Sequence, residues 1–360
     1  MGFQCGIVGL PNVGKSTLFN ALTRAGAASA NYPFCTIEPN VGVVAVPDPR
    51  LDRLAELYRP KRVVPTQMRF VDIAGLVAGA SRGEGLGNQF LAHIREVDAV
   101  CHVVRLFEEP DVTHVAGRVD PAADVATVET ELMLADLETV GRRLEKVRRQ
   151  AKGDRSLAAQ VAYLEAVEAA LAEGRRPAPP EGEAEARWLA ECRLLTVKPT
   201  LYVANVDEGQ LAELEAALAP LRAAVGEAEI VPVCAAVEAE LAELAPEEQA
   251  ELLEAYGLEE PGLARLIRAG YRLLGLITFL TAGPDEVRAW TVAEGTAAPQ
   301  AAGVIHSDFE RGFIRAEVMR FEDLDRLGSE QAVKEAGLLR IEGRDYVIQD
   351  GDVVYFRFNV

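Results

Sequence analysis

The sequence predicts an α/β protein built around a mostly parallel sheet, and three observations support this prediction. Apolar runs at residues 3–9, 100–107 and 199–204 are typical of buried strands, and helical patterns separate them. A glycine-rich loop directly follows the first run. From about residue 276 the pattern changes to short strands with interspersed helices, which predicts a second, smaller α+β domain.

The bulk composition limits the class of protein. With 360 residues, 49% of them hydrophobic, the chain can bury the cores of two or three domains. The net charge of −19 argues against non-specific nucleic-acid binding over the whole surface. Five scattered cysteines with no C-x-x-C pair favour a reducing cytosol over a disulfide framework or zinc site. No apolar segment approaches the roughly 18 residues of a membrane span. We therefore expect a cytoplasmic protein with no membrane contact. We also expect it to be a monomer.

Residues 9–17 read G-L-P-N-V-G-K-S-T, the G-x-x-x-x-G-K-S/T spacing of a phosphate-binding loop. Gly9 and Gly14 allow the turn and the close approach of backbone to phosphate. Lys15 is expected to reach the β- and γ-phosphates as a catalytic residue, and the Ser16 hydroxyl to ligate Mg²⁺. The residues expected to hold the nucleotide phosphates are Asn12, Val13, Gly14, Lys15, Ser16 and Thr17.

Two later segments are expected to respond to the γ-phosphate. Asp72 begins a D-x-x-G sequence at the end of an apolar strand and would hold Mg²⁺ through water, while the Gly75 N–H would sense the γ-phosphate. Thr36 is placed to close on Mg²⁺. The residue after Gly75 is Leu76, which stands where many switch proteins have a glutamine that orients the attacking water. Either hydrolysis is slow or another group positions that water.

Two alternatives for that group remain open. His114 follows the fourth strand, at the edge of an α/β sheet that faces the ligand, and is a candidate catalytic residue. Asn12 could instead help to hold K⁺ beside the phosphates. His93 and His102 lie in an apolar helix and an apolar strand, so both are expected to be structural.

The base site is predicted from N205-V-D-E208, where many guanine-binding switch proteins have N-K-x-D. The aspartate of that motif accepts two hydrogen bonds from guanine, and Glu208 is one methylene longer. Guanine preference should therefore be lost, and adenine would need backbone groups near Val206. Asn205 is expected to brace the phosphate loop. Cys234 and Ala235 follow another apolar strand and should line the base. This reasoning favours ATP over GTP without excluding GTP.

About 90 residues separate the fourth and fifth strands, far more than an ordinary connection. Apolar spacing predicts a helix through residues 125–147, a break at 151–156, a second helix through 157–171 and a third around Trp188. The tip, Arg142–Arg155, contains seven basic and two acidic residues. It is either a solvated face with internal ion pairs or an arm that touches rRNA phosphate.

In the C-terminal segment, strands are expected near 289–292, 312–319, 346–348 and 353–358, with helices at 298–306 and 322–336. The Asp350–Gly351 turn should join the last two strands as a hairpin. No catalytic constellation is visible here, so we expect an interaction module.

These motifs together resemble the YchF, or Obg-like ATPase, family of P-loop NTPases. The resemblance extends over the whole chain and includes the segments at 32–40, 72–90, 298–306 and 342–360. It implies a P-loop NTPase domain with a G-domain-like fold over 1–275, interrupted by a helical coiled-coil hairpin at 123–196. It also implies a TGS-type β-grasp domain over 276–360 that helps to contact the ribosome.

The same resemblance implies Mg²⁺-dependent hydrolysis of ATP in preference to GTP, and ribosome association. It places Asn205, Val206 and Glu208 beside the base, and Ser16 and Thr36 beside Mg²⁺. Cys35 is the thiol to suspect in redox regulation, although a small buried cysteine is the simpler interpretation. A GTPase of the same fold and a nucleotide-gated ribosome-binding scaffold with negligible hydrolysis remain as alternatives.

Overall fold

The computed structural model describes residues 3–29, 40–73, 86–109 and 117–359. The chain divides into two compact units. The first contains residues 3–42 and 69–266, and the second contains residues 43–68 and 267–360. Residues 43–68 thus group with the C-terminal part of the chain, whereas the sequence predicted a single boundary near residue 275.

The first unit is built on a parallel sheet. Its strands are β1 (Gln4–Val8), β4 (Gln67–Asp72), β5 (Ala99–Arg105), β6 (Thr200–Asn205) and β7 (Ile230–Val233). Their order is β4-β1-β5-β6-β7, with every neighbouring pair parallel. β2 (Val41–Ala45), which starts in this unit, lies next to β4 at the edge. All seven residues of the central strand β5 are buried, as expected where both faces of a parallel sheet are covered.

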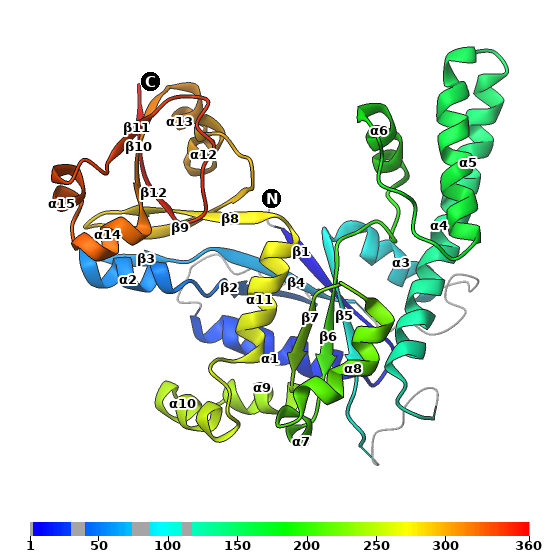
Figure 1. Ribbon diagram of the computed structural model, residues 1–360, viewed down its shortest axis with the longest axis horizontal. Coiled ribbons are helices and arrows are strands. Elements are labelled where there is room, and N and C mark those ends of the chain that lie inside the picture. The colour runs from blue at the N-terminus through cyan, green and yellow to red at the C-terminus, as the bar shows by residue number, and fades with distance from the viewer. Residues whose placement is uncertain (1–2, 30–39, 74–85, 110–116, 360) are drawn as a thin grey trace. The chain divides into compact units, whose positions relative to one another are not determined.

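Helices connect the strands of this sheet (Figure 1). They are α1 (Lys15–Ser29), α3 (Leu86–Glu96), α7 (Glu208–Leu211), α8 (Leu214–Val225), α9 (Ala235–Leu241), α10 (Pro246–Ala255) and α11 (Gly262–Leu273), which runs into the second unit. On one face, Leu218 and Leu221 of α8 pack with Val104 of β5 and Ala204 of β6. The predicted α/β class with a mostly parallel sheet is confirmed.

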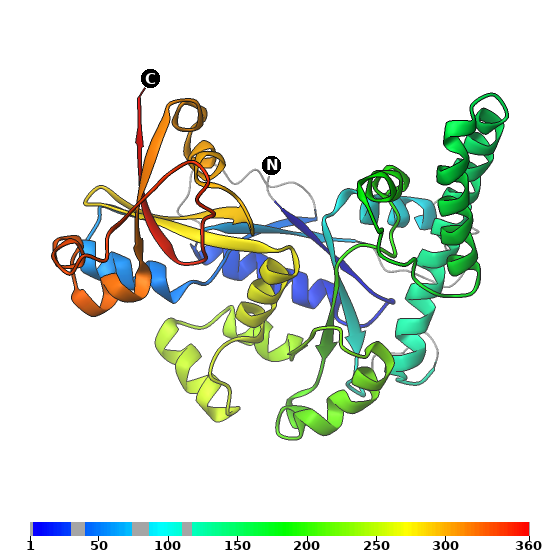
Figure 2. The same cartoon turned by 45° about the horizontal axis from the view of Figure 1, so that its top comes forward.

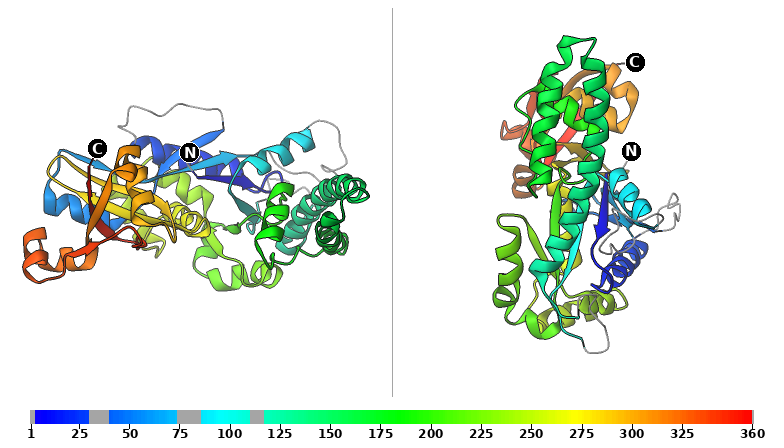
Figure 3. Two further views of the ribbon diagram at one scale, coloured as in Figure 1. Left: turned by 90° about the horizontal axis from the view of Figure 1, so that it is seen from above. Right: turned by 90° about the vertical axis from the view of Figure 1, so that its right-hand side faces the viewer.

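The insertion between β5 and β6 is a helical hairpin. α4 (Pro121–Ala151) and α5 (Ala158–Ala172) lie side by side, joined by a short 3₁₀ turn (Arg155–Leu157) (Figures 1 and 3). α6 (Glu183–Cys192) lies alongside them (Figure 2). Buried apolar residues at helical spacing hold the hairpin together, among them Leu144 and Leu164. These spans agree with the helices that the sequence predicted.

The second unit contains a mixed sheet of order β11-β10-β12-β8-β9-β3. Its strands are β3 (Arg62–Val64), β8 (Leu276–Ala282), β9 (Glu286–Ala293), β10 (Phe313–Arg320), β11 (Arg340–Glu342) and β12 (Asp352–Phe358). Its helices are α2 (Pro49–Tyr58), α12 (Ala298–Ile305), α13 (Ser307–Arg311), α14 (Phe321–Leu327) and α15 (Glu330–Glu335). The helix expected over 322–336 is two helices, because Gly328 adopts a φ of 77° and ends α14.

The predicted C-terminal hairpin is wrong. β12 pairs antiparallel with β10 and parallel with β8, not with residues 346–348. That segment forms only one isolated bridge, Ala297↔Val347. Its backbone is satisfied elsewhere, since the Ile348 N–H donates to the Thr296 carbonyl at 3.0 Å. Within the described ranges, no helix is both long enough and apolar enough to cross a bilayer.

Candidate functional site

The phosphate loop connects β1 to α1 and depends on its two glycines. Gly9 has a φ of 152° and Gly14 a φ of 95°, and Asn12 between them also has a positive φ of 61°. A Cβ on Gly9 would lie 2.5 Å from the Val103 carbonyl oxygen. A Cβ on Gly14 would lie 2.1 Å from Nδ2 of Asn205. Neither position can accept a larger side chain without moving the loop.

Asn205, at the end of β6, holds this loop from behind. Its Nδ2 donates to the carbonyl oxygen of Val13 at 2.9 Å, and its Oδ1 accepts the N–H of Ala235 at 3.1 Å. The side chain is buried, so both hydrogen bonds are shielded from water. One amide therefore connects the phosphate loop, the end of β6 and the start of α9, which is the bracing role expected from the sequence.

Lys15, the first residue of α1, is buried and its Nζ donates to the Leu10 carbonyl oxygen at 2.6 Å. Burial lowers its pKa to about 8, and the nearby Asp72 carboxylate partly opposes that shift. Burial also raises the pKa of Asp72, and Lys15 opposes that shift in turn. An ammonium that lacks full solvation is well suited to bind an anion, because the anion restores the lost stabilisation.

The loop and β4 offer the ligands that Mg²⁺ prefers. The Ser16 hydroxyl is exposed at the start of α1, and Asp72 ends β4, which pairs with β1 through Ile7↔Asp72. Mg²⁺ commonly takes only one or two protein oxygen ligands and completes its shell with phosphate and water. Across the described ranges, no group of three or more His, Cys, Asp and Glu residues is arranged to hold a metal ion. This donor set fits a nucleotide-bound Mg²⁺ better than a protein-caged metal.

Some of the predicted site residues belong to segments that the structure does not describe. Thr36, Gly75 and His114 lie outside the described residues, as do Cys35 and Leu76. Their roles stay predictions. The four cysteines that are described, Cys5, Cys101, Cys192 and Cys234, are all buried and free.

Two residues expected near the base, Val206 and Ala235, donate their backbone N–H groups to hydrogen bonds within the protein. The Val206 N–H donates to the Val233 carbonyl at 3.0 Å, and the Val206 side chain is buried. The Ala235 N–H is bound to Asn205, and neighbouring Cys234 is also buried. Adenine N1 needs a hydrogen-bond donor, and the Val206 N–H is already engaged with Val233.

The Glu208 side chain has a hydrogen-bond partner that the sequence did not indicate. Its carboxylate accepts a hydrogen bond at 2.9 Å from the hydroxyl of Tyr256, which follows α10. The same hydrogen bond raises the pKa of Tyr256. Because the two residues are far apart in the chain, no local pattern could indicate this pairing.

Arg105 is the second residue that sequence reasoning missed. It is buried at the end of β5, and its guanidinium donates to the carbonyl oxygens of Phe107 at 3.0 Å and Asn12 at 3.4 Å. It thus ties the phosphate loop to the segment after β5. A signal existed, since Arg105 is a charged residue at the end of a strand that is apolar except for His102.

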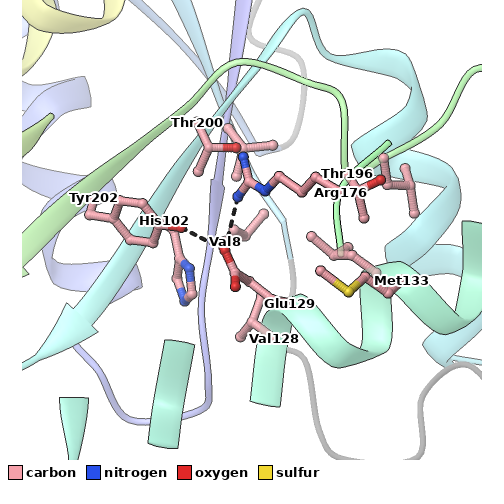
Figure 4. A pocket seen from close by; sticks show the side chains of 12 residues that line it. Val8, His102, Val128, Glu129, Met133, Arg176, Thr196, Thr200 and Tyr202 are labelled. Atoms are coloured by element: carbon pink, nitrogen blue, oxygen red, sulfur yellow. Dashed lines mark hydrogen bonds and ion pairs between the residues drawn. The ribbon is translucent and has the colours of Figure 1, made fainter. Parts of the chain in front are cut away.

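His102 is structural, as the sequence predicted. It is buried in β5, and burial lowers its pKa to about 3, with Lys15 contributing. It therefore stays neutral near pH 7. The adjoining cavity of about 20 Å³ is too small for a nucleotide, and Glu129 there accepts hydrogen bonds from Tyr202 and Arg176 (Figure 4).

The parallel sheet, the glycine loop and the buried lysine at the start of α1 define a P-loop nucleotide-binding protein of the GTPase fold class. A family model described as a 50S ribosome-binding GTPase matches residues 4–137. A second model, YchF-GTPase_C, described as a protein of unknown function (DUF933), matches residues 276–359.

Full-length relatives identify the family. The ribosome-binding ATPase YchF of Haemophilus ducreyi is 56% identical, and that of Bacillus subtilis is 54% identical; each alignment covers 100% of both chains. The solved structure of the Schizosaccharomyces pombe YchF GTPase superposes with a TM-score of 0.89 at 38% identity, covering 99% of this chain and 98% of that one. The chain belongs to the YchF family.

Proposed function

We propose that this chain is a Mg²⁺-dependent ATPase that prefers ATP to GTP and associates with the ribosome as a cytoplasmic monomer. Two groups of facts support the proposal. Its full-length curated relatives carry the name ribosome-binding ATPase. In its own sequence, Glu208 stands where guanine-binding switch proteins have the shorter aspartate.

The observation that carries the ATP preference is the pairing of Glu208 with Tyr256. Guanine recognition needs a carboxylate that accepts from N1–H and the 2-amino group together. Glu208 is one methylene too long for that position, and its Oε2 already accepts from Tyr256. Losing such a bidentate contact costs roughly 1–3 kcal/mol, by analogy with other side-chain readout of bases.

The phosphate side supplies the chemistry. The N–H groups of residues 12–17, at the start of α1, would hold the phosphates, and Lys15 would place its ammonium beside the β- and γ-oxygens. Ser16 and Asp72, with Thr36, would hold Mg²⁺, which supplies neutralising charge to the transferred phosphoryl group. Gly75 would sense the γ-phosphate, and His114 or a K⁺ ion beside Asn12 would assist the attacking water. Replacing K⁺ by Na⁺ should lower turnover if the ion takes part.

The proposal is tested by calorimetric titration of the full chain with Mg-ATP and with Mg-GTP. We expect ATP to bind at least tenfold more tightly. Tight GTP binding with ATP ignored would overturn the adenine assignment. Single-turnover rates with and without ribosomes follow, and we expect acceleration by ribosomes.

A GTPase is the second candidate, because both the matched family model and the Schizosaccharomyces pombe structure are described as GTPases. The titration separates it from an ATPase. A ribosome-binding scaffold would show nucleotide binding, a negligible basal rate and no acceleration.

A further inference from the structure

A groove of about 710 Å³ lies in the first unit, away from the nucleotide site. Its walls are the turn from α3 into β5 (95–98), the turn into β6 (196–198), residues 176–180 and the end of α6. Both turns precede parallel strands, so they lie at the amino-terminal edge of the sheet. The phosphate loop follows the carboxyl end of β1 at the opposite edge. We call this feature the α6 groove.

The α6 groove is cationic in a strongly acidic chain. Its lining includes Arg95, Arg176, Arg193 and Lys198 against Glu96 and Asp98. The Asp98 carboxylate is partly engaged, because it accepts the Gln4 N–H at 2.9 Å. With a net charge of −19 for the chain, a local excess of positive charge marks the groove as a place for an anionic partner.

The cations are held in place before any partner arrives. Arg176 pairs with Glu129 at 2.9 Å, which offsets its charge, so the positive excess of the groove comes from Arg95, Arg193 and Lys198 (Figure 4). The Lys198 ammonium donates to the carbonyl oxygens of Arg95 and Val97. Burial lowers the pKa of Lys198, Asp98 opposes this shift, and the charge of Arg193 lowers the pKa further. A partner's carboxylate placed between Lys198 and Arg193 would relieve the repulsion between these two cations.

Arg193 is the most available of these charges. It caps the carboxyl end of α6 with a φ of 49°, and its side chain is exposed. It makes no ion pair with any residue in the described part of the chain. Its guanidinium can therefore form a bidentate contact with a carboxylate without first breaking another.

The remaining lining distinguishes between anionic partners. Pro177, Pro179, Pro180 and Leu189 form an apolar wall, and Val197 is 41% exposed. Among the residues that the structure describes, no aromatic side chain lines the groove, so nucleic-acid bases would find no stacking surface. Proline fixes its own φ, which makes the wall rigid before binding. A partner that carries apolar side chains as well as negative charge matches both features.

We propose that the α6 groove binds an acidic segment of a partner protein, in which carboxylates alternate with apolar side chains. The volume lies within the roughly 300–1,000 Å³ typical of ligand pockets, so it accommodates a few side chains of an extended segment. The carboxylates face Arg193 and Lys198, and the apolar side chains pack on the proline wall. This function is separate from nucleotide hydrolysis.

The test is fluorescence anisotropy with the full chain and a panel of labelled twelve-residue peptides that alternate Asp or Glu with Leu or Val in different orders. We expect saturable binding that weakens with salt, and at least tenfold weaker binding when Asn and Gln replace the acids. Arg193→Glu should reduce affinity at least tenfold, and Val197→Ser several-fold. The control Arg187→Glu, on α6 but not lining the groove, should bind like the parent.

Three results would overturn the proposal: no saturable binding in the panel, equal binding of the neutral peptides, or no effect of Arg193→Glu. Tighter binding of a twelve-nucleotide RNA, lost in Arg193→Glu, would make the groove a nucleic-acid site instead. ATP binding is measured on the same samples. Intact ATP uptake without peptide binding therefore rejects the groove alone and leaves the proposed ATPase standing.

Discussion

Asn205 shows how much of this site depends on single side chains. Its amide accepts and donates at the same time, joining the phosphate loop to the start of α9. The loop backbone approaches it so closely that residue 14 must be glycine. The phosphate loop therefore has its binding conformation before nucleotide arrives. Nucleotide binding does not have to supply the free energy needed to order the loop.

Glu208→Asp should shift base preference towards guanine. The shorter carboxylate loses Tyr256 and returns to the position that guanine readout uses. We expect GTP affinity to rise about tenfold or more relative to ATP, measured by competition calorimetry. Tyr256→Phe is the control, since it frees Glu208 without shortening it and should change the ratio less. An unchanged ratio in Glu208→Asp would show that Glu208 does not select the base.

Nucleotide affinity should depend on pH through Lys15, whose pKa is about 8 in the free site. Below that pH the ammonium is present in both free and bound states. Above it the free site is neutral, while bound phosphate favours the charged form, so binding must take up a proton. Affinity should therefore fall above pH 8, by up to about tenfold per pH unit. Calorimetry between pH 7 and 9.5 measures this, and Lys15→Arg should give a flat profile.

At the scale of elements, the helical hairpin depends on a buried polar anchor as well as its apolar seam. Asp136 of α4 is fully buried, and its carboxylate accepts from the N–H groups of Leu195 and Thr196 and from the Thr196 hydroxyl. Burial raises the pKa of Asp136, and these hydrogen bonds oppose that shift. The anchor fixes the chain where it leaves α6 and returns to β6.

Asp136→Ala should destabilise the protein by about 3 kcal/mol, because it leaves buried donors of Leu195 and Thr196 without acceptors. Thermal unfolding followed by circular dichroism should show a Tm lower by several degrees. Glu138→Ala is the matched control, since its exposed carboxylate pairs with Arg142 at 3.8 Å and contributes little. Equal effects of the two changes would contradict the anchoring role.

At the scale of the whole molecule, the distribution of charge matters more than its total. In the structure some basic residues of the hairpin tip form internal ion pairs and others do not. Arg143 and Arg148 form ion pairs with Glu191 and Glu165. Lys152 and Arg155, at the turn, are exposed and form no ion pair with described residues. Part of the cluster is thus internal pairing, and the turn itself remains available for phosphate.

Charge reversal at the turn should weaken ribosome binding. The triple change Arg149→Glu, Lys152→Glu and Arg155→Glu should lower affinity at least tenfold and reduce the salt dependence, because phosphate contacts are lost. Co-sedimentation at several salt concentrations measures both. The swap Arg148→Glu with Glu165→Arg keeps the net charge and the pair, and should bind like the parent. Unchanged pelleting of the triple variant would reject the basic tip as a contact.

The sequence by itself determined what is local. The strand, glycine loop and helix at residues 3–29 form a contiguous unit, and the amphipathic spacing of α4 and α5 lies within each helix. Such features need only neighbours a few residues apart, so periodicity and motif spacing predict them. The loss of the guanine motif at Glu208 could be predicted in the same way.

Only the tertiary structure decided which distant groups meet. Residues 346–348 have the composition of a strand but no strand partner, because β12 pairs with β10 and β8 instead. Arg105 reaches Asn12, Tyr256 reaches Glu208, and the α6 groove forms from four separate segments. The physical reason is that a buried polar group forms its hydrogen bonds with whichever groups the fold brings near it. Which groups come near depends on the packing of the whole chain, not on the local sequence.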